Sequence, residues 1–131
     1  MDKQEAEKRR EKLRTEYNAN IVANEIRIDE LRKQSRDVEN SLDESYYFYS
    51  RLKNMLEQHQ EEHAQYGAHA EVDILGMVEY DTNQDYCKVN YALLDEQDEI
   101  EKKRKNLYRD REEMDYTYRR AQYALEEEGR K

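Results

Sequence analysis

The chain has 131 residues, of which 42% are charged and 36% are hydrophobic, and its formal net charge is -9. So small an apolar fraction excludes a single large globular core, and the complete absence of proline leaves no residue that forces a helix to stop. Disorder is disfavoured because disordered chains are poor in aromatic residues, whereas this chain has 12 tyrosines. The charged residues are mostly Glu, Lys and Arg, which lose little entropy in a helix, so we expect an all-α protein.

The sequence also indicates a compartment. Its single cysteine, Cys87, cannot form an intramolecular disulfide, and no signal-peptide pattern stands at the N-terminus. No apolar run approaches the roughly 20 residues that span a bilayer. We therefore expect a cytoplasmic protein that is not embedded in a membrane.

Residues 3 to 66 carry the repeat of a coiled coil. From Tyr17 onward, positions spaced alternately by four and three residues hold side chains without a formal charge, and we call these positions the heptad seam. They are Tyr17, Ile21, Asn24, Ile28, Leu31, Ser35, Val38, Leu42, Ser45, Tyr49, Leu52, Leu56, His59, His63 and Tyr66. The pattern predicts one long helix, the first arm, from about residue 3 to about residue 66.

The most apolar stretch of the chain, residues 70–78, follows the first arm. Its apolar side chains include Val72, Ile74, Leu75 and Met77. Gly67 precedes the stretch, and Asp81-Thr82-Asn83 after it supply side chains that commonly cap helix N-termini. We therefore place the bend of the chain at about residues 67 to 83.

Residues 84 to 128 repeat the heptad pattern. Apolar residues stand seven apart at Tyr86, Leu93, Ile100, Leu107, Met114 and Ala121. The alternate seam positions are Asn90, Gln97, Arg104, Arg111, Tyr118 and Leu125. Two arms joined by one bend predict a single domain over residues 1–131, an elongated antiparallel two-helix hairpin with coiled-coil-like packing.

Charge is unevenly distributed along the chain. Between Glu57 and Glu101 there are 13 acidic residues and one basic residue, Lys88, whereas the remainder carries 19 acidic and 22 basic residues. Opposite charges attract a partner to a surface, so a protein that binds near the bend should be basic.

Four consecutive aromatic residues, Tyr46-Tyr47-Phe48-Tyr49, surround a full turn of the first arm. Successive side chains are about 100° apart on a helix, so Tyr49 faces the seam and the others point elsewhere. One interpretation is that the second arm covers two of the remaining rings. We favour a docking patch, because Tyr is enriched at protein interfaces. We assign partner binding to these four residues and to the apolar bend residues Val72, Ile74, Leu75 and Met77.

Two further patterns raise the question of other activities. His59-Gln60-Glu61-Glu62-His63 has the H-x-x-E-H spacing of a helical zinc-protease motif, but a two-helix hairpin offers no cleft that excludes water. Lys102-Lys103-Arg104-Lys105 follows acidic residues directly, which favours ion pairs on a solvated helix face over phosphate binding. We therefore expect no enzyme activity, no metal site, no cofactor and no nucleic-acid partner.

A small acidic hairpin with Tyr-rich arms and an apolar bend resembles the WXG and LXG superfamily of Gram-positive type VII secretion. Ile74-Leu75-Gly76 has the hydrophobic-x-Gly form of the family's bend motif, with Ile in the place of Leu, and the chain contains no Trp. Tyr123 and Glu127 fit the family's export signal, Tyr-x-x-x-Asp or Glu. The similarity is greatest to the small helical proteins that accompany LXG toxins to the secretion machine.

The resemblance implies a non-enzymatic adaptor or chaperone that binds the helical N-terminal domain of an LXG-type toxin and targets it for type VII secretion. A second small helical protein is a further partner that it implies. The protein would act in the cytoplasm, with co-export as an open alternative. A self-associating coiled-coil scaffold, as a homodimer, is the alternative function, and a metal-dependent enzyme is the third.

Overall fold

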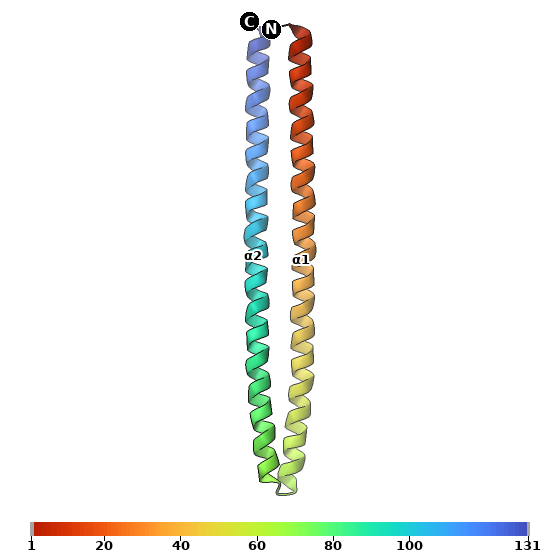
Figure 1. Cartoon of the computed structure of the whole chain (residues 1–131), viewed down its shortest axis with the longest axis vertical. Helices are drawn as coiled ribbons and strands as arrows, with labels where there is room; N and C mark the ends of the chain where they lie inside the picture. The colour runs from red at the N-terminus through yellow and green to blue at the C-terminus, as the bar shows by residue number, and fades with distance from the viewer. Residues whose placement is uncertain (1, 131) are drawn as a thin grey trace. The chain divides into compact units, whose positions relative to one another are not determined.

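The computed structural model describes residues 2–130, which form two α-helices and a short turn (Figure 1). Helix α1 (Lys3–Gln65) has 63 residues and helix α2 (His69–Arg130) has 62. No strand occurs among these described residues. The predicted all-α helical hairpin is therefore confirmed.

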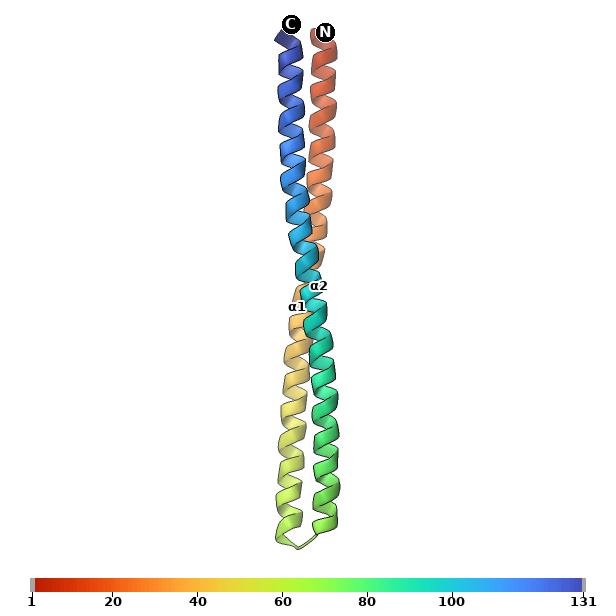
Figure 2. The same cartoon turned by 90° about the vertical axis from the view of Figure 1, so that its left-hand side faces the viewer.

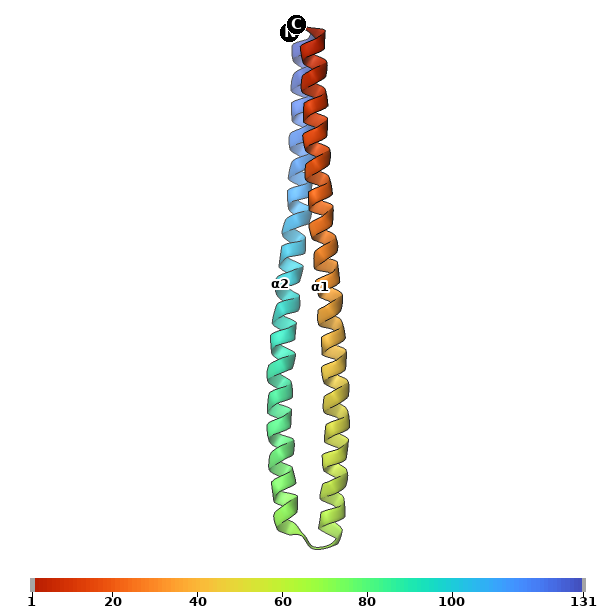
Figure 3. The ribbon, with the colours of Figure 1, turned by 45° about the vertical axis from the view of Figure 1, so that its right-hand side comes forward.

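The two helices divide into two compact units. The terminal unit comprises Met1–Gln34 and Ile100–Lys131, and the bend unit comprises Ser35–Glu99. In each unit the α1 and α2 segments are antiparallel, because residues later in α1 bond to residues earlier in α2. Tyr17 bonds to Asp115 and Asn24 to Leu107 in the terminal unit, and Ser35 bonds to Gln97 and Gln60 to Glu79 in the bend unit. Figure 2 and Figure 3 show the two segments of the bend unit from two further directions.

The heptad seam forms the core of the terminal unit. Ile28, Leu31 and Ile100 are buried there, as the sequence predicts. Asn24 is also buried, at 3% exposure, and its Nδ2 donates to the backbone oxygen of Leu107 at 2.9 Å. A polar residue at a core position favours one register of the helices, since a shifted register would leave its side chain without this partner.

The seam continues through the first part of the bend unit. Val38 and Leu56 are buried, and Leu52 is half-buried. Tyr49 packs on Tyr86 with ring centroids 4.4 Å apart and an interplanar angle of 8°. Apolar burial and ring stacking thus hold the two helices together where few other seam residues are fully buried.

The predicted seam differs by one residue at His59, whereas the next predicted position, His63, is half-buried. His59 is exposed, and Gln60 lies against α2 instead, where its Nε2 donates to Glu79 Oε2 at 3.1 Å. A helix with 3.6 residues per turn drifts from a strict seven-residue repeat, so the contact face moves along the helix surface. Tyr66, the last predicted seam position, lies after the end of α1 and is exposed.

A glycine ends the first helix. Gly67 has a φ of 74°, the left-handed conformation that glycine adopts without a steric penalty. Its backbone nitrogen donates to Ala64 at 3.2 Å, and the nitrogen of Ala68 donates to His63 at 2.9 Å. This pair of bonds is the Schellman arrangement, which satisfies carbonyls at a helix C-terminus.

The bend is shorter than the sequence predicts. Residues 69–83, which the sequence places in the bend region, are helical, and the second arm begins at His69 instead of near residue 84. Gly76 lies inside the helix, which costs only about 1 kcal/mol relative to Ala and does not stop it. Asn83 is no cap, because its Oδ1 accepts a 2.8 Å hydrogen bond from the Tyr49 hydroxyl across the seam.

Candidate functional site

The four consecutive aromatic residues of α1 occupy two different environments. Tyr49 is half-buried in the seam, where it stacks on Tyr86, so the prediction that this ring faces the second arm is confirmed. Tyr46, Tyr47 and Phe48 are 62%, 66% and 70% exposed. The interpretation that the second arm covers two of these three rings is therefore wrong. One seam between two helices contacts a narrow stripe of each, and residues one to three positions before Tyr49 fall outside it.

Two of the exposed rings line a groove on α1. The groove is shallow and open to solvent, because residues of α1 alone line it, and its volume is about 730 Å³. Tyr47, Phe48, Leu52 and Met55 supply its apolar lining. Asp43 and Glu44 contribute carboxylates to the same groove, and Arg51 also lines it. The Arg51 guanidinium carbon lies 5.8 Å from the centroid of the Tyr47 ring, within the range of a cation–π contact. We call this hollow the α1 groove.

A second hollow lies between the two helices of the bend unit. It has a volume of about 290 Å³, and Phe48 and Leu52 line it as they line the α1 groove. From α2 it is lined by Thr82, Asp85, Tyr86 and Val89. We call it the interhelical hollow. Because Phe48 and Leu52 belong to both, the two hollows form one continuous apolar surface.

The contribution of Val89 to this surface is missing from the sequence-based site. The signal that would have found it is its heptad position: Val89 directly precedes the seam residue Asn90, as Phe48 directly precedes Tyr49. In an antiparallel pair of helices, residues at the same heptad position beside the seam face each other across the two helices. Exposed apolar residues at this position in both helices, here Phe48 and Val89, therefore predict one apolar surface to which both helices contribute.

The apolar residues assigned to the bend separate into two pairs. Val72 and Leu75 are half-buried in the bend unit, whereas Ile74 and Met77 are exposed on α2. None of the four lines the α1 groove or the interhelical hollow. The structure thus does not bring them together with the aromatic residues of α1.

The candidate export residues lie in the terminal unit. Tyr123 and Glu127 are both exposed, and both stand within α2, which continues to Arg130. In the structure the Tyr-x-x-x-Glu sequence is part of the second helix and does not follow it.

The histidine motif is part of a solvated helix surface. His59 Nδ1 lies 3.8 Å from Glu62 Oε2, both side chains are more than half exposed, and His63 is half-buried. Within residues 2–130 no group of three or more His, Cys, Asp or Glu side chains is arranged to hold a metal ion. In the basic run, Arg104 lies 3.3 Å from Glu101, and farther along α2 Arg111 lies 3.0 Å from Glu25. Carboxylates thus contact two of the bases along this part of α2.

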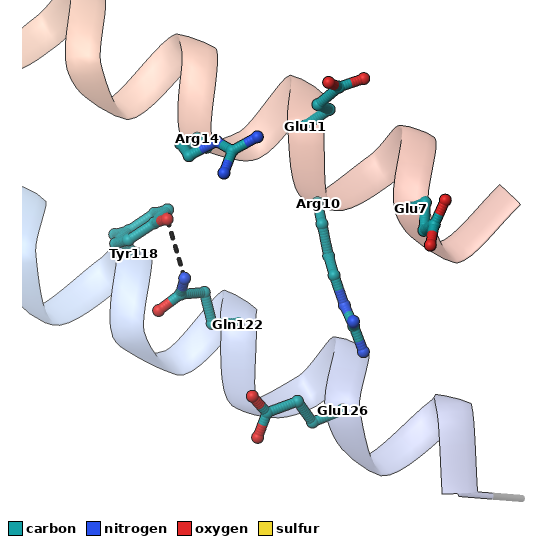
Figure 4. A pocket seen from close by; sticks show the side chains of 7 residues that line it. All are labelled: Glu7, Arg10, Glu11, Arg14, Tyr118, Gln122 and Glu126. Carbon is teal, nitrogen blue, oxygen red and sulfur yellow. Dashed lines mark hydrogen bonds between the residues drawn. The ribbon is translucent and has the colours of Figure 1, made fainter. Parts of the chain in front are cut away.

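The terminal unit has a hollow of a different character. Figure 4 shows Arg10 extending from α1 toward α2, and Glu126 on α2, around a hollow of about 370 Å³. Glu7, Glu11 and Arg14 complete its charged lining, and the Tyr118 hydroxyl accepts a 2.8 Å hydrogen bond from Gln122. Charges of both signs line this hollow, in contrast to the mainly apolar lining of the α1 groove.

Two tyrosines of the terminal unit have shifted pKa values. The Tyr17 hydroxyl donates to Asp115 Oδ1, and this hydrogen bond raises the pKa of Tyr17 above its ordinary value. Arg32 donates to the Tyr108 hydroxyl at 3.0 Å and, with a smaller contribution from Arg104, lowers the pKa of Tyr108. Tyr17 also lines a hollow of about 400 Å³ between the two helices. Both hydrogen bonds join α1 to α2 within the terminal unit.

Comparison with known proteins gives no significant match to a protein family, to a curated protein or to a solved structure. None of the helical stretches between residues 2 and 130 combines the length and apolar character that a membrane crossing requires. In the bend unit, Phe48 and Leu52 join the α1 groove and the interhelical hollow into one apolar surface, and this surface is the candidate docking site.

Proposed function

We propose that this protein is a non-enzymatic helical adaptor or chaperone that binds a helical segment of another protein through its bend unit. The observation that carries the proposal is the exposure of Tyr47 and Phe48 beside a groove of about 730 Å³. Exposed apolar surface of this kind typically marks a contact with another chain, and aromatic residues dominate the energy of such contacts.

The most specific form of the proposal is targeting of a toxin for type VII secretion. The helical hairpin, the Ile74-Leu75-Gly76 sequence and the Tyr123 and Glu127 pair support it through their resemblance to the WXG and LXG superfamily. In this form the partner is the helical N-terminal domain of an LXG-type toxin, alone or with a second small helical protein. The complex would assemble in the cytoplasm, and the adaptor would remain there or leave with its cargo.

A self-associating scaffold is the second candidate. The same exposed residues of the bend unit favour it, because a second copy would offer Phe48 and Val89 the apolar contact that they lack within the unit. A concentration-dependent homodimer in light scattering, with no other protein bound in the native host, would support the scaffold over the adaptor.

The test of the adaptor is recovery of the tagged protein from its native host, followed by identification of the proteins that accompany it. The chain offers a matched pair of variants, because Tyr47 with Arg51 and Tyr116 with Arg120 have the same geometry. The Arg guanidinium carbons lie 5.8 Å and 5.7 Å from the two ring centroids, and the rings are 66% and 62% exposed. Tyr47→Ala in the bend unit should release the partner, whereas Tyr116→Ala in the terminal unit should retain it.

The expected size of the effect is large for one of these variants only. An aromatic residue central to an interface costs about 2 kcal/mol or more when truncated to Ala, which is roughly thirtyfold in affinity. A solvent-exposed ring outside the interface changes neither affinity nor folding appreciably. Recovery of a single stoichiometric helical partner supports the adaptor, and its absence from preparations of the unaltered protein rejects it.

A further inference from the structure

The two units differ sharply in charge. Residues 35–99 contain 16 Asp or Glu and 4 Lys or Arg, so the bend unit has a formal charge of -12. The other residues contain 16 Asp or Glu and 19 Lys or Arg, so the terminal unit has a formal charge of +3. The apolar surface formed by the α1 groove and the interhelical hollow therefore lies in a strongly acidic environment.

Carboxylates stand at the edge of this surface. Asp43 and Glu44 line the α1 groove, and Asp85 lines the interhelical hollow. Arg51 also lines the α1 groove, so three carboxylates and one guanidinium line the whole surface. None of the three carboxylates forms an ion pair with another described residue. They are therefore available to a cationic group of a bound molecule without breaking an existing contact.

We infer that this surface binds a cationic amphipathic helix of the partner protein, an inference that rests on the proposed function and specifies the chemistry of the partner. The apolar face of such a helix would pack on Phe48, Leu52 and Met55 of α1 and on Val89 of α2. Its flanking Lys or Arg side chains would meet Asp43, Glu44 and Asp85. Binding of a helix in a groove through residues spaced by three and four positions is a common recognition mode, and it matches an apolar surface with charged edges.

Charge complementarity selects this occupant over a second copy of the chain. A homodimer through the bend unit would bring together two units that each have a formal charge of -12, and like charges placed close together oppose association. A basic helix gains both the apolar contact and the attraction to the carboxylates. Electrostatic complementarity of this kind increases the association rate and rejects acidic competitors.

The test uses three synthetic peptides of about three heptads each and the purified full-length protein. The first peptide carries Leu at the core positions of an amphipathic helix and Lys at the flanks, the second has Glu in the place of Lys, and the third is a scrambled form of the first. The Leu/Lys peptide should bind in fluorescence anisotropy at least about tenfold more tightly than either of the others. Its affinity should fall as salt rises toward about 1 M, where screening shortens the range of charge interactions to about 3 Å.

Variants locate the binding surface. The double variant Phe48→Ala and Met55→Ala should weaken binding of the Leu/Lys peptide about thirtyfold, as expected for anchors at the centre of an interface. Replacement of Asp43, Glu44 and Asp85 by Asn, Gln and Asn should weaken it about tenfold and reduce its dependence on salt. Tyr116→Ala in the terminal unit is the control, which should bind as the unaltered protein does. Circular dichroism should show that all variants keep their helix content.

Several results would overturn the inference. Equal binding of the Leu/Lys and scrambled peptides would mean that charge alone attracts them, and unchanged binding by the Phe48 and Met55 double variant would place the site elsewhere. A homodimer that this double variant dissociates would assign the surface to a second copy. The adaptor function is tested separately, by the partner recovered from the native host. Failure of the peptide test can therefore be distinguished from failure of the adaptor proposal.

Discussion

Replacement of Tyr49 by Ala tests how the bend unit is held together. Tyr49 contributes a stacked ring pair with Tyr86, a 2.8 Å hydrogen bond to Asn83 and a half-buried apolar ring. Ring stacking adds about 1 kcal/mol beyond burial, a partly exposed hydrogen bond about 1 kcal/mol, and half-burial of the ring about 1 kcal/mol. Their sum predicts a loss of about 3 kcal/mol in the free energy of unfolding, and a fall of roughly 10 °C in melting temperature for a chain of this size.

Urea unfolding followed by far-UV circular dichroism measures this loss. Tyr49→Phe should cost only about 1 kcal/mol, because it removes the hydrogen bond and keeps the stacked ring. Tyr46→Ala is the control, since an exposed residue three positions earlier should change stability by about 0.5 kcal/mol or less. Equal losses for the two alanine variants would refute the assignment of Tyr49 to the seam, as would a loss below about 0.5 kcal/mol for Tyr49→Ala.

Three further outcomes are expected. Arg104→Leu should raise the free energy of unfolding by about 1 kcal/mol in urea titrations, because Arg104 occupies a seam position where its buried Nε has no hydrogen-bond partner among the described residues. In alkaline titration followed by phenolate absorbance, Tyr108 should ionise before Tyr17, with Tyr108→Phe and Tyr17→Phe identifying the two transitions. The Tyr17 contribution to stability is present below the ordinary tyrosine pKa and is lost as pH rises through its raised pKa; the Tyr108 contribution is present above the ordinary value and is lost as pH falls through its lowered pKa. The cognate partner at 100 times its Kd should stabilise the protein by about 2.7 kcal/mol, and a melting temperature above about 90 °C for the protein alone would contradict its dependence on a partner.

The fold was predictable from the heptad spacing, because seam positions that hold charged residues also lie between the two helices. Arg104 and Arg111 carry charges, yet both are half-buried in the seam, since a long side chain can pack its methylene groups against a neighbouring helix while its guanidinium reaches a carboxylate at the edge. Spacing was therefore a better guide to these positions than residue type. The same spacing predicted the wrong seam residue only near the end of the first arm, where Gln60 and not His59 faces the second helix.

The bend was harder to place because the local signals for it were nearly equivalent. Gly67 and Gly76 both offer a residue that ends helices, and only the backbone conformation separates them: Gly67 is left-handed, whereas Gly76 continues α2. The cap-like residue Asn83 was misleading for a different reason. Its side chain bonds across the helices to Tyr49, and a contact between residues 34 positions apart leaves no trace in the local sequence.

The edges of the seam explain why we expect the partner to bind the bend unit. In the terminal unit, polar side chains bridge the helices at the seam edges: Arg111 contacts Glu25, and Arg32 donates to Tyr108. Each such exposed pair contributes little to the free energy of folding. The polar groups of these pairs are, however, well solvated by water, so this edge of the seam can remain exposed. At the corresponding edge of the bend unit, Phe48 and Val89 line the interhelical hollow and are 70% and 48% exposed. Burial of such apolar surface is favourable at about 25 cal/mol per Å², so a bound helix gains most where the hairpin leaves its own seam edge uncovered.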